Sequence, residues 1–160
     1  LKFNEKTTGY IEERKSEMNL PVDYIAVHIR RGDKIVSREM KELGLSLYID
    51  AVKGKKHISR NVFIATDDSS VKDELKSILV AEGFNVYCNT AVTQTGFDES
   101  LFNTKDKKSR YIDTLNMLLD MDILIHSSFF IGTYTSNVSR IVPLYVGFGK
   151  SLSLDDEWKL

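Results

Sequence analysis

The sequence is poor in residues that mark special classes of protein, with one cysteine, two prolines and one tryptophan among 160 residues. Cys88 has no second cysteine with which to form an internal disulfide, so nothing indicates an oxidising compartment. No apolar run approaches the roughly 20 residues that a membrane-spanning helix needs, and no signal-peptide pattern opens the chain. We therefore expect neither a disulfide-stabilised scaffold nor a membrane span in this segment.

The overall charge is close to balanced, with a formal net charge of −1, 42% hydrophobic residues and 28% charged residues. This composition excludes a disordered chain and gives no general attraction for nucleic acid, so no nucleic-acid partner is expected. Any anion binding must come from local clusters. The length suits one domain with a sizeable core, and we predict a single domain over residues 1–160. Because the chain begins with Leu1 rather than methionine, we expect it to be part of a longer protein.

Apolar runs alternate with helical patterns along the chain, which is typical of a parallel sheet covered by helices on both faces. Strands are predicted at residues 24–29, 62–65, 84–88 and 129–133. Helices are predicted at residues 4–18, 45–57, 69–81, 109–125 and 137–145, with a polar loop at residues 89–107. Asp68 or Ser69 would cap the third helix. The predicted fold class is a Rossmann-like α/β domain, in which ligands bind at the carboxyl ends of the strands.

Polar clusters follow three of the predicted strands, namely HIRRGDK, TDD and TYTSN. Because the carboxyl ends of parallel strands lie at one rim, we expect these clusters to meet there. Arg30 and Arg31 carry planar, permanently charged forks of donors that match phosphate oxygens. An equally open alternative is that one arginine pairs with Asp33 or another carboxylate and only holds the turn.

The TYTSN segment, residues 133–137, lies between a predicted strand and a predicted helix. Backbone N–H groups at a helix start, beside the hydroxyls of Thr135 and Ser136, can seat an anion. Simple N-capping by Ser136 or Asn137 is the alternative, and both can hold together.

The helix predicted at residues 109–125 carries several acids. Asp120 and Asp122 resemble the DxD element with which many glycosyltransferases hold a metal, but at this spacing they lie roughly 200° apart and cannot face one ion. Asp113, Asn116 and Asp120 share a stripe, and an acid facing the rim could accept from the N–H groups of a purine. A solvated stripe is the alternative. No GxGxxG or Walker A segment is present, which disfavours NAD or ATP chemistry.

The segments VHIRRGDK, VFIATDD, LLDMDILIHSSFFIGTYTSNVSR and SLSLDD together resemble, in order and spacing, motifs of the alpha-1,6-fucosyltransferase family. That family includes animal core fucosyltransferases and bacterial nodulation-type enzymes, and the resemblance extends along nearly the whole chain to Asp156. It implies the C-terminal, GDP-fucose-binding half of a two-domain, GT-B-type architecture. The implied activity is inverting transfer of fucose from a GDP-fucose donor to a sugar hydroxyl of a glycan or glycoconjugate acceptor, without a metal or other cofactor.

The resemblance also implies roles for individual residues. His28 and Asp120 would contact the nucleoside, while Arg30, helped by Arg31, would hold the β-phosphate. The other implied site residues are Ser136 and Asn137 in the phosphate-binding turn, Asp33 and Lys34, which would order the site, and Asp67 and Asp68 beside the donor.

The chain departs from the family pattern at several positions. The expected general base is a glutamate four residues after the motif lysine, but Arg38 stands there and Glu39 follows it. A one-residue insertion before Tyr48, itself at a family site position, would make Glu39 the base. Asn137 replaces a glutamine with a shorter amide, and Gly32 replaces a threonine, which should loosen the turn.

Two functions besides the transferase agree with parts of the sequence. A non-catalytic nucleotide-sugar-binding module would use Arg30 but not Glu39. An interaction domain bearing the RGD tripeptide, Arg31 to Asp33, is disfavoured because the tripeptide directly follows a buried strand. The compartment stays open: the Golgi lumen if the protein works like its animal relatives, or the cytosol if its source is bacterial or viral.

Overall fold

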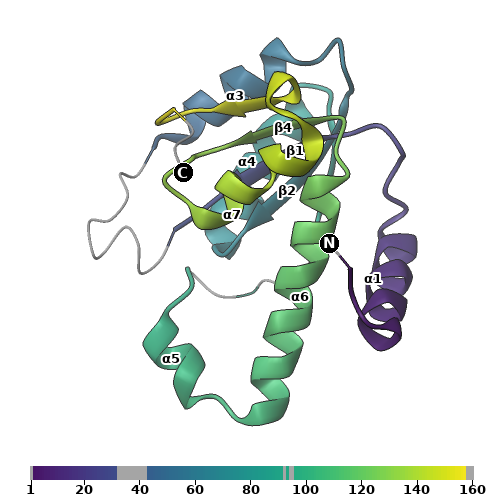
Figure 1. The fold of residues 1–160 in the computed structure, drawn as a ribbon. Coiled ribbons are helices and arrows are strands. Elements are labelled where there is room, and N and C mark those ends of the chain that lie inside the picture. The colour runs from purple at the N-terminus through teal and green to yellow at the C-terminus, as the bar shows by residue number, and fades with distance from the viewer. Residues whose placement is uncertain (1, 32–42, 92, 94–95, 158–160) are drawn as a thin grey trace.

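The computed structural model describes residues 2–31, 43–91, 93 and 96–157. Its centre is a five-stranded sheet in the order β3-β2-β1-β4-β5. Every strand pairing is parallel, which confirms the predicted Rossmann-like α/β class (Figure 1). The strands are β1 Ile25–Ile29, β2 Asn61–Thr66, β3 Asn85–Cys88, β4 Phe129–Gly132 and β5 Ser151–Ser153.

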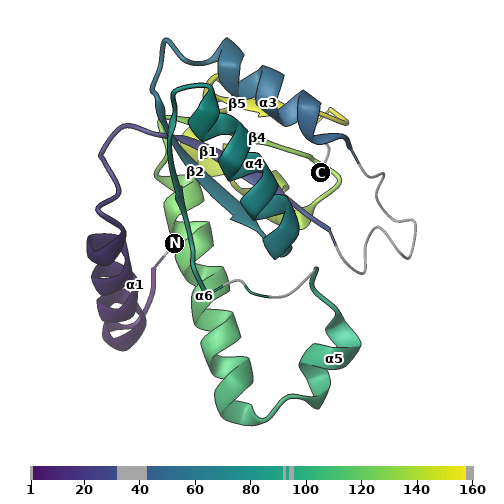
Figure 2. The ribbon, with the colours of Figure 1, turned by 180° about the vertical axis from the view of Figure 1, so that it is seen from behind.

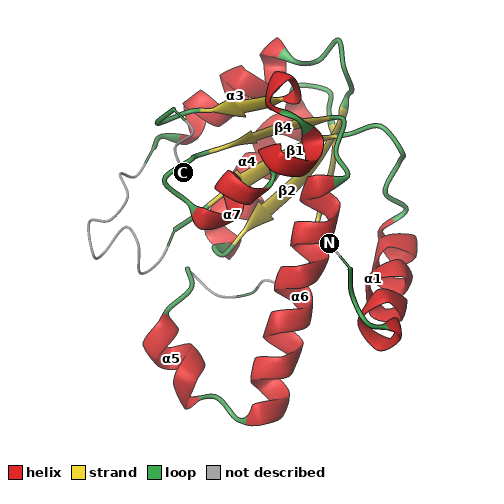
Figure 3. Cartoon of the chain, in the orientation of Figure 1, coloured by secondary structure: helices red, strands yellow, loops and turns green. Residues whose placement is uncertain are grey.

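Helices cover both faces of the sheet, as Figure 3 shows. One face is covered by α3 and α4, which stand in front of the sheet in Figure 2. The other face is covered by α6 and the short helices that follow β4, and α1 packs against α6. The helices are α1 Glu5–Met18, α3 Leu45–Gly54, α4 Ser69–Ala81, α5 Glu99–Thr104, α6 Lys107–Ile125, α7 Asn137–Ile141, α8 Pro143–Val146 and the 3-10 helix η1 Phe148–Lys150. Among these helices, none is both long and apolar enough to cross a membrane.

Local sequence signals explain the ends of several helices. The Asn4 side chain accepts from the Thr7 N–H at the start of α1, and Asn19 ends that helix in the left-handed conformation, with φ of 49°. Asp68 caps α4, as predicted. At the end of α4, Gly83 has φ of 82°, a conformation that glycine adopts without strain.

The structure differs from the sequence prediction in three places. The segment 89–107, predicted to be a polar loop, contains α5, whose first turn is capped by Asp98. The helix predicted at residues 137–145 is two short helices, because Pro143 lacks the backbone N–H that a continuous helix would need. The strand β5 was not predicted, because it has only three residues and these are half-buried.

The strand order places the topological switch point of the sheet between β1 and β4. The chain leaves β1 through α3 to β2 on one side, and it returns through α6 to β4 on the other side. In such a sheet the connections that follow these two strands diverge, which opens the usual ligand position at their carboxyl ends. The N-terminal part of α6, together with α5, extends beyond this edge of the sheet (Figure 1).

Alternation along β1 decides which side chains point to which face of the sheet. Ile25, Val27 and Ile29 belong to the core under α3 and α4, whereas Ala26 belongs to the core under α6. Since successive side chains point to opposite faces of a sheet, His28 lies on the α6 face with Ala26. The β1 side chain nearest the rim on that face is therefore a buried imidazole.

Gly132, the last residue of β4, permits a close approach of buried groups. A Cβ atom at this position would lie 2.6 Å from Phe130 Cζ and 2.6 Å from Ser139 Oγ. Both neighbours are fully buried, at 0% exposure. The absence of a side chain therefore lets α7 pack directly on the end of β4.

We expect Gly132→Ala to lower the free energy of unfolding by about 1–3 kcal/mol, because the new methyl group overpacks a closed space. The matched control is Gly9→Ala in the interior of α1, where an added Cβ meets nothing within 4 Å. That change should stabilise the protein by roughly 0.5–1 kcal/mol, since alanine has the higher helix propensity. Urea unfolding of both variants measures the difference, and equal effects would contradict the packing argument.

Candidate functional site

The basic turn after β1 is held by Asp67, the residue that follows β2. Register pairs Ile29 with Thr66, which brings Arg30 and Asp67 to the same level of the rim. The Arg30 guanidinium lies 3.0 Å from Asp67 Oδ2, and the Arg31 backbone N–H donates to Asp67 Oδ1 at 2.7 Å. The ion pair that the sequence left open is thus present, and its carboxylate is Asp67.

Arg30 and Arg31 have different surroundings. The Arg30 side chain is 22% exposed and its guanidinium lies 5.0 Å from the ring centroid of Phe97, whose backbone N–H donates to Asp67 Oδ2 at 3.0 Å. Arg31 is buried, at 7% exposure, and its guanidinium donates to the Leu43 carbonyl at 2.9 Å. Arg30 therefore keeps a surface toward solvent at the rim, whereas Arg31 braces the turn from inside.

His28 lies behind this turn and is neutral. It is 8% exposed, and its Nδ1 lies 2.7 Å from Ser139 Oγ on α7. Burial lowers the pKa of His28 to about 3, and the positive charge of Arg30 adds to this effect. An imidazole in this position cannot supply positive charge to a ligand near neutral pH, but it can donate or accept one hydrogen bond.

The TYTSN turn is shaped by Asp155, which follows β5. The Asp155 carboxylate accepts from the backbone N–H of Tyr134 at 2.7 Å and of Thr135 at 3.2 Å, and also from the Thr135 hydroxyl. It accepts in addition from Ser153 Oγ at 2.7 Å. Partial burial alone would raise the pKa of Asp155, but the hydrogen bonds from Thr135 and Ser153 outweigh it and keep the pKa below its usual value.

The hydrogen bonds to Asp155 reduce the number of donors in the TYTSN turn that remain available to bind an anion. The donors of Thr135 are already used by Asp155, so Thr135 supports the turn from behind. Ser136 is at the N-cap position of α7, but its side chain makes no capping hydrogen bond. Ser136 is buried and Asn137 is exposed.

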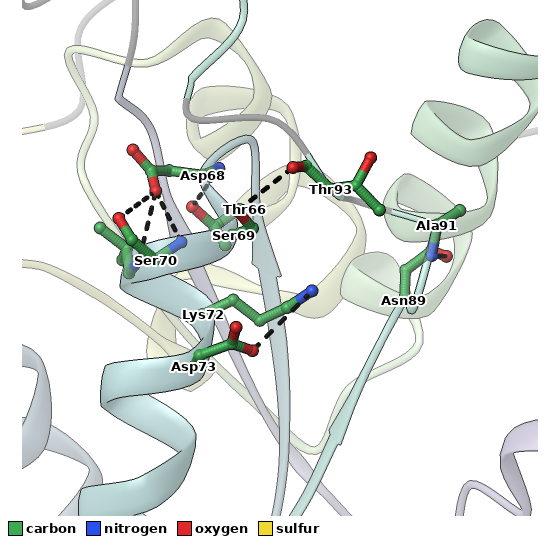
Figure 4. Close-up of polar contacts among 10 residues, drawn as sticks. Thr66, Asp68, Ser69, Ser70, Lys72, Asp73, Asn89, Ala91 and Thr93 are labelled. Carbon is green, nitrogen blue, oxygen red and sulfur yellow. Dashed lines mark hydrogen bonds and ion pairs between the residues drawn. The ribbon is translucent and has the colours of Figure 1, made fainter.

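Asp68 has a structural role in the described residues. Its Oδ1 accepts from the backbone N–H groups of Ser70 at 2.9 Å and Val71 at 3.3 Å, and from the Ser70 hydroxyl at 2.6 Å (Figure 4). Partial burial alone would raise the pKa of Asp68, but these hydrogen bonds lower it below its usual value. Asp68 thus fixes the start of α4 behind the rim, while Asp67 faces the arginines.

The acidic stripe on α6 is a hydrogen-bonded network rather than a solvated face. The buried Asn89, which follows β3, donates from Nδ2 to Asn116 Oδ1 at 3.2 Å and to Asp120 Oδ1 at 3.3 Å. Tyr10 of α1 donates to the same Asn116 oxygen at 3.0 Å, and Asp113 pairs with Lys105. The solvated alternative from the sequence is therefore wrong for Asn116 and Asp120. Sequence spacing found the stripe but gave no sign of Asn89.

Asp120 and Asp122 diverge, as their helical spacing requires. Asp122 is buried and forms an ion pair with Lys15 of α1 at 3.1 Å, whereas Asp120 meets Asn89. Burial raises the pKa of Asp120 to about 7, and the hydrogen bond from Asn89 only partly offsets it. Within the part of the chain that the structure describes, no group of three or more His, Cys, Asp or Glu side chains could hold a metal ion.

Tyr48, another predicted site residue, is buried in the core under α3 and α4, and its hydroxyl group is close enough to the rim for the charges of Arg31 and Asp155 to act on it. It belongs to α3 and is 2% exposed, and burial raises its pKa to about 12 while the charge of Arg31 opposes the rise. The predicted site residues Asp33, Lys34 and Glu39 lie outside the described residues, as does Gly32, the departure from the family pattern.

The parallel strand order defines a Rossmann-like α/β domain, and its polar clusters lie at the edge where such domains usually bind ligands. The model of a protein family described as alpha-(1,6)-fucosyltransferase N- and catalytic domains matches residues 1–144. The chain therefore belongs to the alpha-(1,6)-fucosyltransferase family. A sequence search of curated proteins finds no match.

Solved structures share this fold. The fucosyltransferase NodZ from Bradyrhizobium aligns with a TM-score of 0.61 at 21% identity, over 91% of this chain and 43% of NodZ. NodZ alpha-1,6-fucosyltransferase co-crystallised with GDP gives a TM-score of 0.59 at 21% identity, with the same coverage of 91% and 43%. POFUT1 in complex with GDP-fucose gives 0.62 at 14% identity, over 99% of this chain and 48% of POFUT1. The chain thus spans less than half the length of each of these structures.

The raised pKa of Asp120 predicts a specific pH dependence of stability. A carboxyl group whose folded pKa lies above its unfolded value of about 3.9 binds more protons in the folded state. Its contribution to stability is favourable below that unfolded value and is lost as pH rises toward about 7. We expect Asp120→Asn to gain stability relative to wild type as pH is raised from 4 to 8, measured by thermal unfolding across that range. A constant difference would contradict the pKa.

Proposed function

We propose that this chain is the nucleotide-sugar-binding half of a longer, two-domain fucosyltransferase that transfers fucose from GDP-fucose to a hydroxyl of a glycan or glycoconjugate. The family match supports this activity, and NodZ and POFUT1, the proteins of like fold, were solved with GDP or GDP-fucose. The single structural observation that carries the proposal is the position of Arg30 at the carboxyl end of β1, paired with Asp67 and next to the switch point of the sheet between β1 and β4.

The chemistry proposed for Arg30 follows from its charge. When the bond between fucose C1 and the β-phosphate oxygen breaks, the electron pair goes to the GDP leaving group, and its negative charge must be stabilised. A pre-positioned guanidinium supplies that stabilisation without reorganising during the reaction. The ion pair with Asp67 does not prevent Arg30 from stabilising the leaving group. It orients the Arg30 guanidinium and leaves the side chain partly exposed. We propose that the reaction needs no metal for this reason.

The acceptor hydroxyl must lose a proton as it attacks C1 from the opposite face, which inverts the configuration there. We propose Glu39 as the general base that takes this proton, with Asp33 and Lys34 ordering the site. The nucleoside is assigned to His28 and Asp120, which lie on the same side of the sheet. The phosphate-facing part of the α7 turn is assigned to Ser136 and Asn137, with Thr135 held in place by Asp155.

Arg30→Ala should weaken GDP binding by about 10- to 100-fold, because a charge-assisted contact contributes about 1.5–3 kcal/mol. Arg30→Lys should recover only part of the affinity, since an ammonium cannot present two parallel donors. The matched control is Arg60→Ala, which removes an exposed arginine before β2, at the opposite edge of the sheet. Calorimetry of the full-length protein with GDP, ADP and UDP, with and without EDTA, measures these effects. Equal affinity for the three nucleotides, or loss of GDP binding in EDTA, would contradict the donor or the metal assignment.

A non-catalytic nucleotide-sugar-binding module is the second candidate function. The observation that favours it is the departure at Arg38 and Glu39 from the family's base position. If the protein is an enzyme, Glu39→Gln should lower the rate of GDP release from GDP-fucose by about 10²- to 10⁴-fold, the usual contribution of a general base, while GDP affinity stays at the wild-type value. A protein that binds GDP-fucose and shows no turnover with any glycan acceptor, in either form, would be a module.

The RGD interpretation receives no support from the described part of the tripeptide. Adhesion of that kind needs an accessible arginine, and Arg31 is 7% exposed with its guanidinium on the Leu43 carbonyl.

A further inference from the structure

Ser139 and His28 form a buried polar pair beside the proposed nucleotide site. His28 is 8% exposed and Ser139 is fully buried. His28 Nδ1 lies 2.7 Å from Ser139 Oγ, and the same oxygen accepts from the Thr133 backbone N–H at 3.4 Å. Register places these residues together, because Val27 of β1 pairs with Ile131 of β4 and α7 follows that strand. Neither the sequence motifs nor the proposed mechanism gives Ser139 a role.

The two contacts of Ser139 fix the positions of the protons. A backbone N–H only donates, so the Thr133 contact uses an oxygen lone pair and leaves the Ser139 hydroxyl hydrogen for another acceptor. Among the described residues, His28 Nδ1 is the other hydrogen-bond partner of that hydroxyl. In the opposite tautomer, Nδ1–H would donate to Ser139 and the hydroxyl hydrogen would be buried without an acceptor, which folded proteins avoid.

We propose that Ser139 is a positioning residue that keeps the proton of His28 on Nε2, so that this nitrogen acts as a hydrogen-bond donor to a nucleoside diphosphate. In the described part of the chain no residue makes a hydrogen bond to Nε2. This nitrogen nevertheless keeps some contact with solvent, unlike the fully buried polar atoms that have no partner. The identity of the ligand rests on the proposed function. The position of the proton does not.

Because the His28 ring is neutral, its tautomer decides which of the two ring nitrogens can donate a hydrogen bond. Burial and the neighbouring Arg30 lower the pKa of this ring to about 3. Near pH 7 the ring therefore carries one proton, on either Nδ1 or Nε2. A donor at His28 also complements Asp120, whose carboxylate accepts on the same side of the sheet. One donor and one acceptor at fixed positions can distinguish a nucleoside by its pattern of N–H groups and oxygens.

The packing around Ser139 supports a role that depends on close distance. A Cβ atom on Gly132 would lie 2.6 Å from Ser139 Oγ, so this oxygen is held where β4 has no side chain. Ser139 is preceded in α7 by Val138, which packs in the core under α6, so the helix cannot rotate freely to release the contact. The Ser139 hydroxyl is therefore held in place by β4 on one side and by the packing of α7 on the other.

Long-range ¹H–¹⁵N correlation spectra of the full-length protein, labelled at histidine, test the tautomer directly without any ligand. His28→Gln identifies the His28 signals among the three histidines. At pH 7 we expect the wild-type ring to be protonated on Nε2 alone, and Ser139→Ala to give a mixture of tautomers. The control is Ser127→Ala, which removes another buried serine hydroxyl, one bonded to the Leu124 carbonyl, and should leave the His28 signals unchanged.

GDP calorimetry on the same variants tests the consequence. Ser139→Ala should weaken binding by about twofold, because only the fraction of molecules that keep the proton on Nε2 can donate to GDP. Ser139→Cys, which keeps a weak donor, should restore part of the loss. A wild-type ring protonated on Nδ1, or a Ser139→Ala protein with wild-type spectra and wild-type GDP affinity, would overturn the proposal. Absence of GDP binding in wild type would refute the proposed function instead, and the ligand-free spectra would still decide the role of Ser139.

Discussion

The carboxylate of Asp67 is the interaction on which the rim depends. It pairs with the Arg30 guanidinium, accepts from the Arg31 backbone N–H and accepts from the Phe97 N–H, so it joins the ends of β1 and β2 to the segment that leads into α5. Three partners on one carboxylate direct the arginine fork before any ligand arrives. Electrostatic stabilisation of a reaction is largest when the charges are already in place, so an arginine held in this way is better prepared for catalysis than a freely moving one.

The two halves of the rim are organised by the same physical device. Asp67 collects donors from the turn after β1, and Asp155 collects donors from the turn after β4. Each acid is contributed by a neighbouring strand end, β2 in one case and β5 in the other. Backbone turns have few ways to keep a fixed shape, and a carboxylate that accepts several N–H groups is an effective one. The turns that follow β1 and β4 are therefore both held in place by hydrogen bonds to a neighbouring carboxylate.

Much of this fold could be predicted from the sequence, because apolar strands and amphipathic helices leave clear periodic patterns. The helix ends at Asn19 and Asp68 and the meeting of polar clusters at one edge followed from such local signals. Contacts between distant residues could not be predicted in this way. Nothing in the spacing of Asn89 reveals that it lies against Asn116 and Asp120. The sequence around Arg30 likewise did not point to Asp67, which the structure shows as an ion-pair partner of Arg30. Such pairings are decided by tertiary packing, which a single sequence does not display.

The position of Asp155 also bears on where this domain ends. The family match stops at residue 144, before β5 and before the acid that braces the turn at Tyr134 and Thr135. A domain cut at that boundary would keep the four strands β1 to β4 and most of the core, yet those two backbone donors would lose their acceptor. A protein trimmed in that way would keep the spectroscopic signs of correct folding while the turn after β4 lost its support. The strand β5 and Asp155 therefore belong with the residues that support the turn after β4, not only with the edge of the sheet.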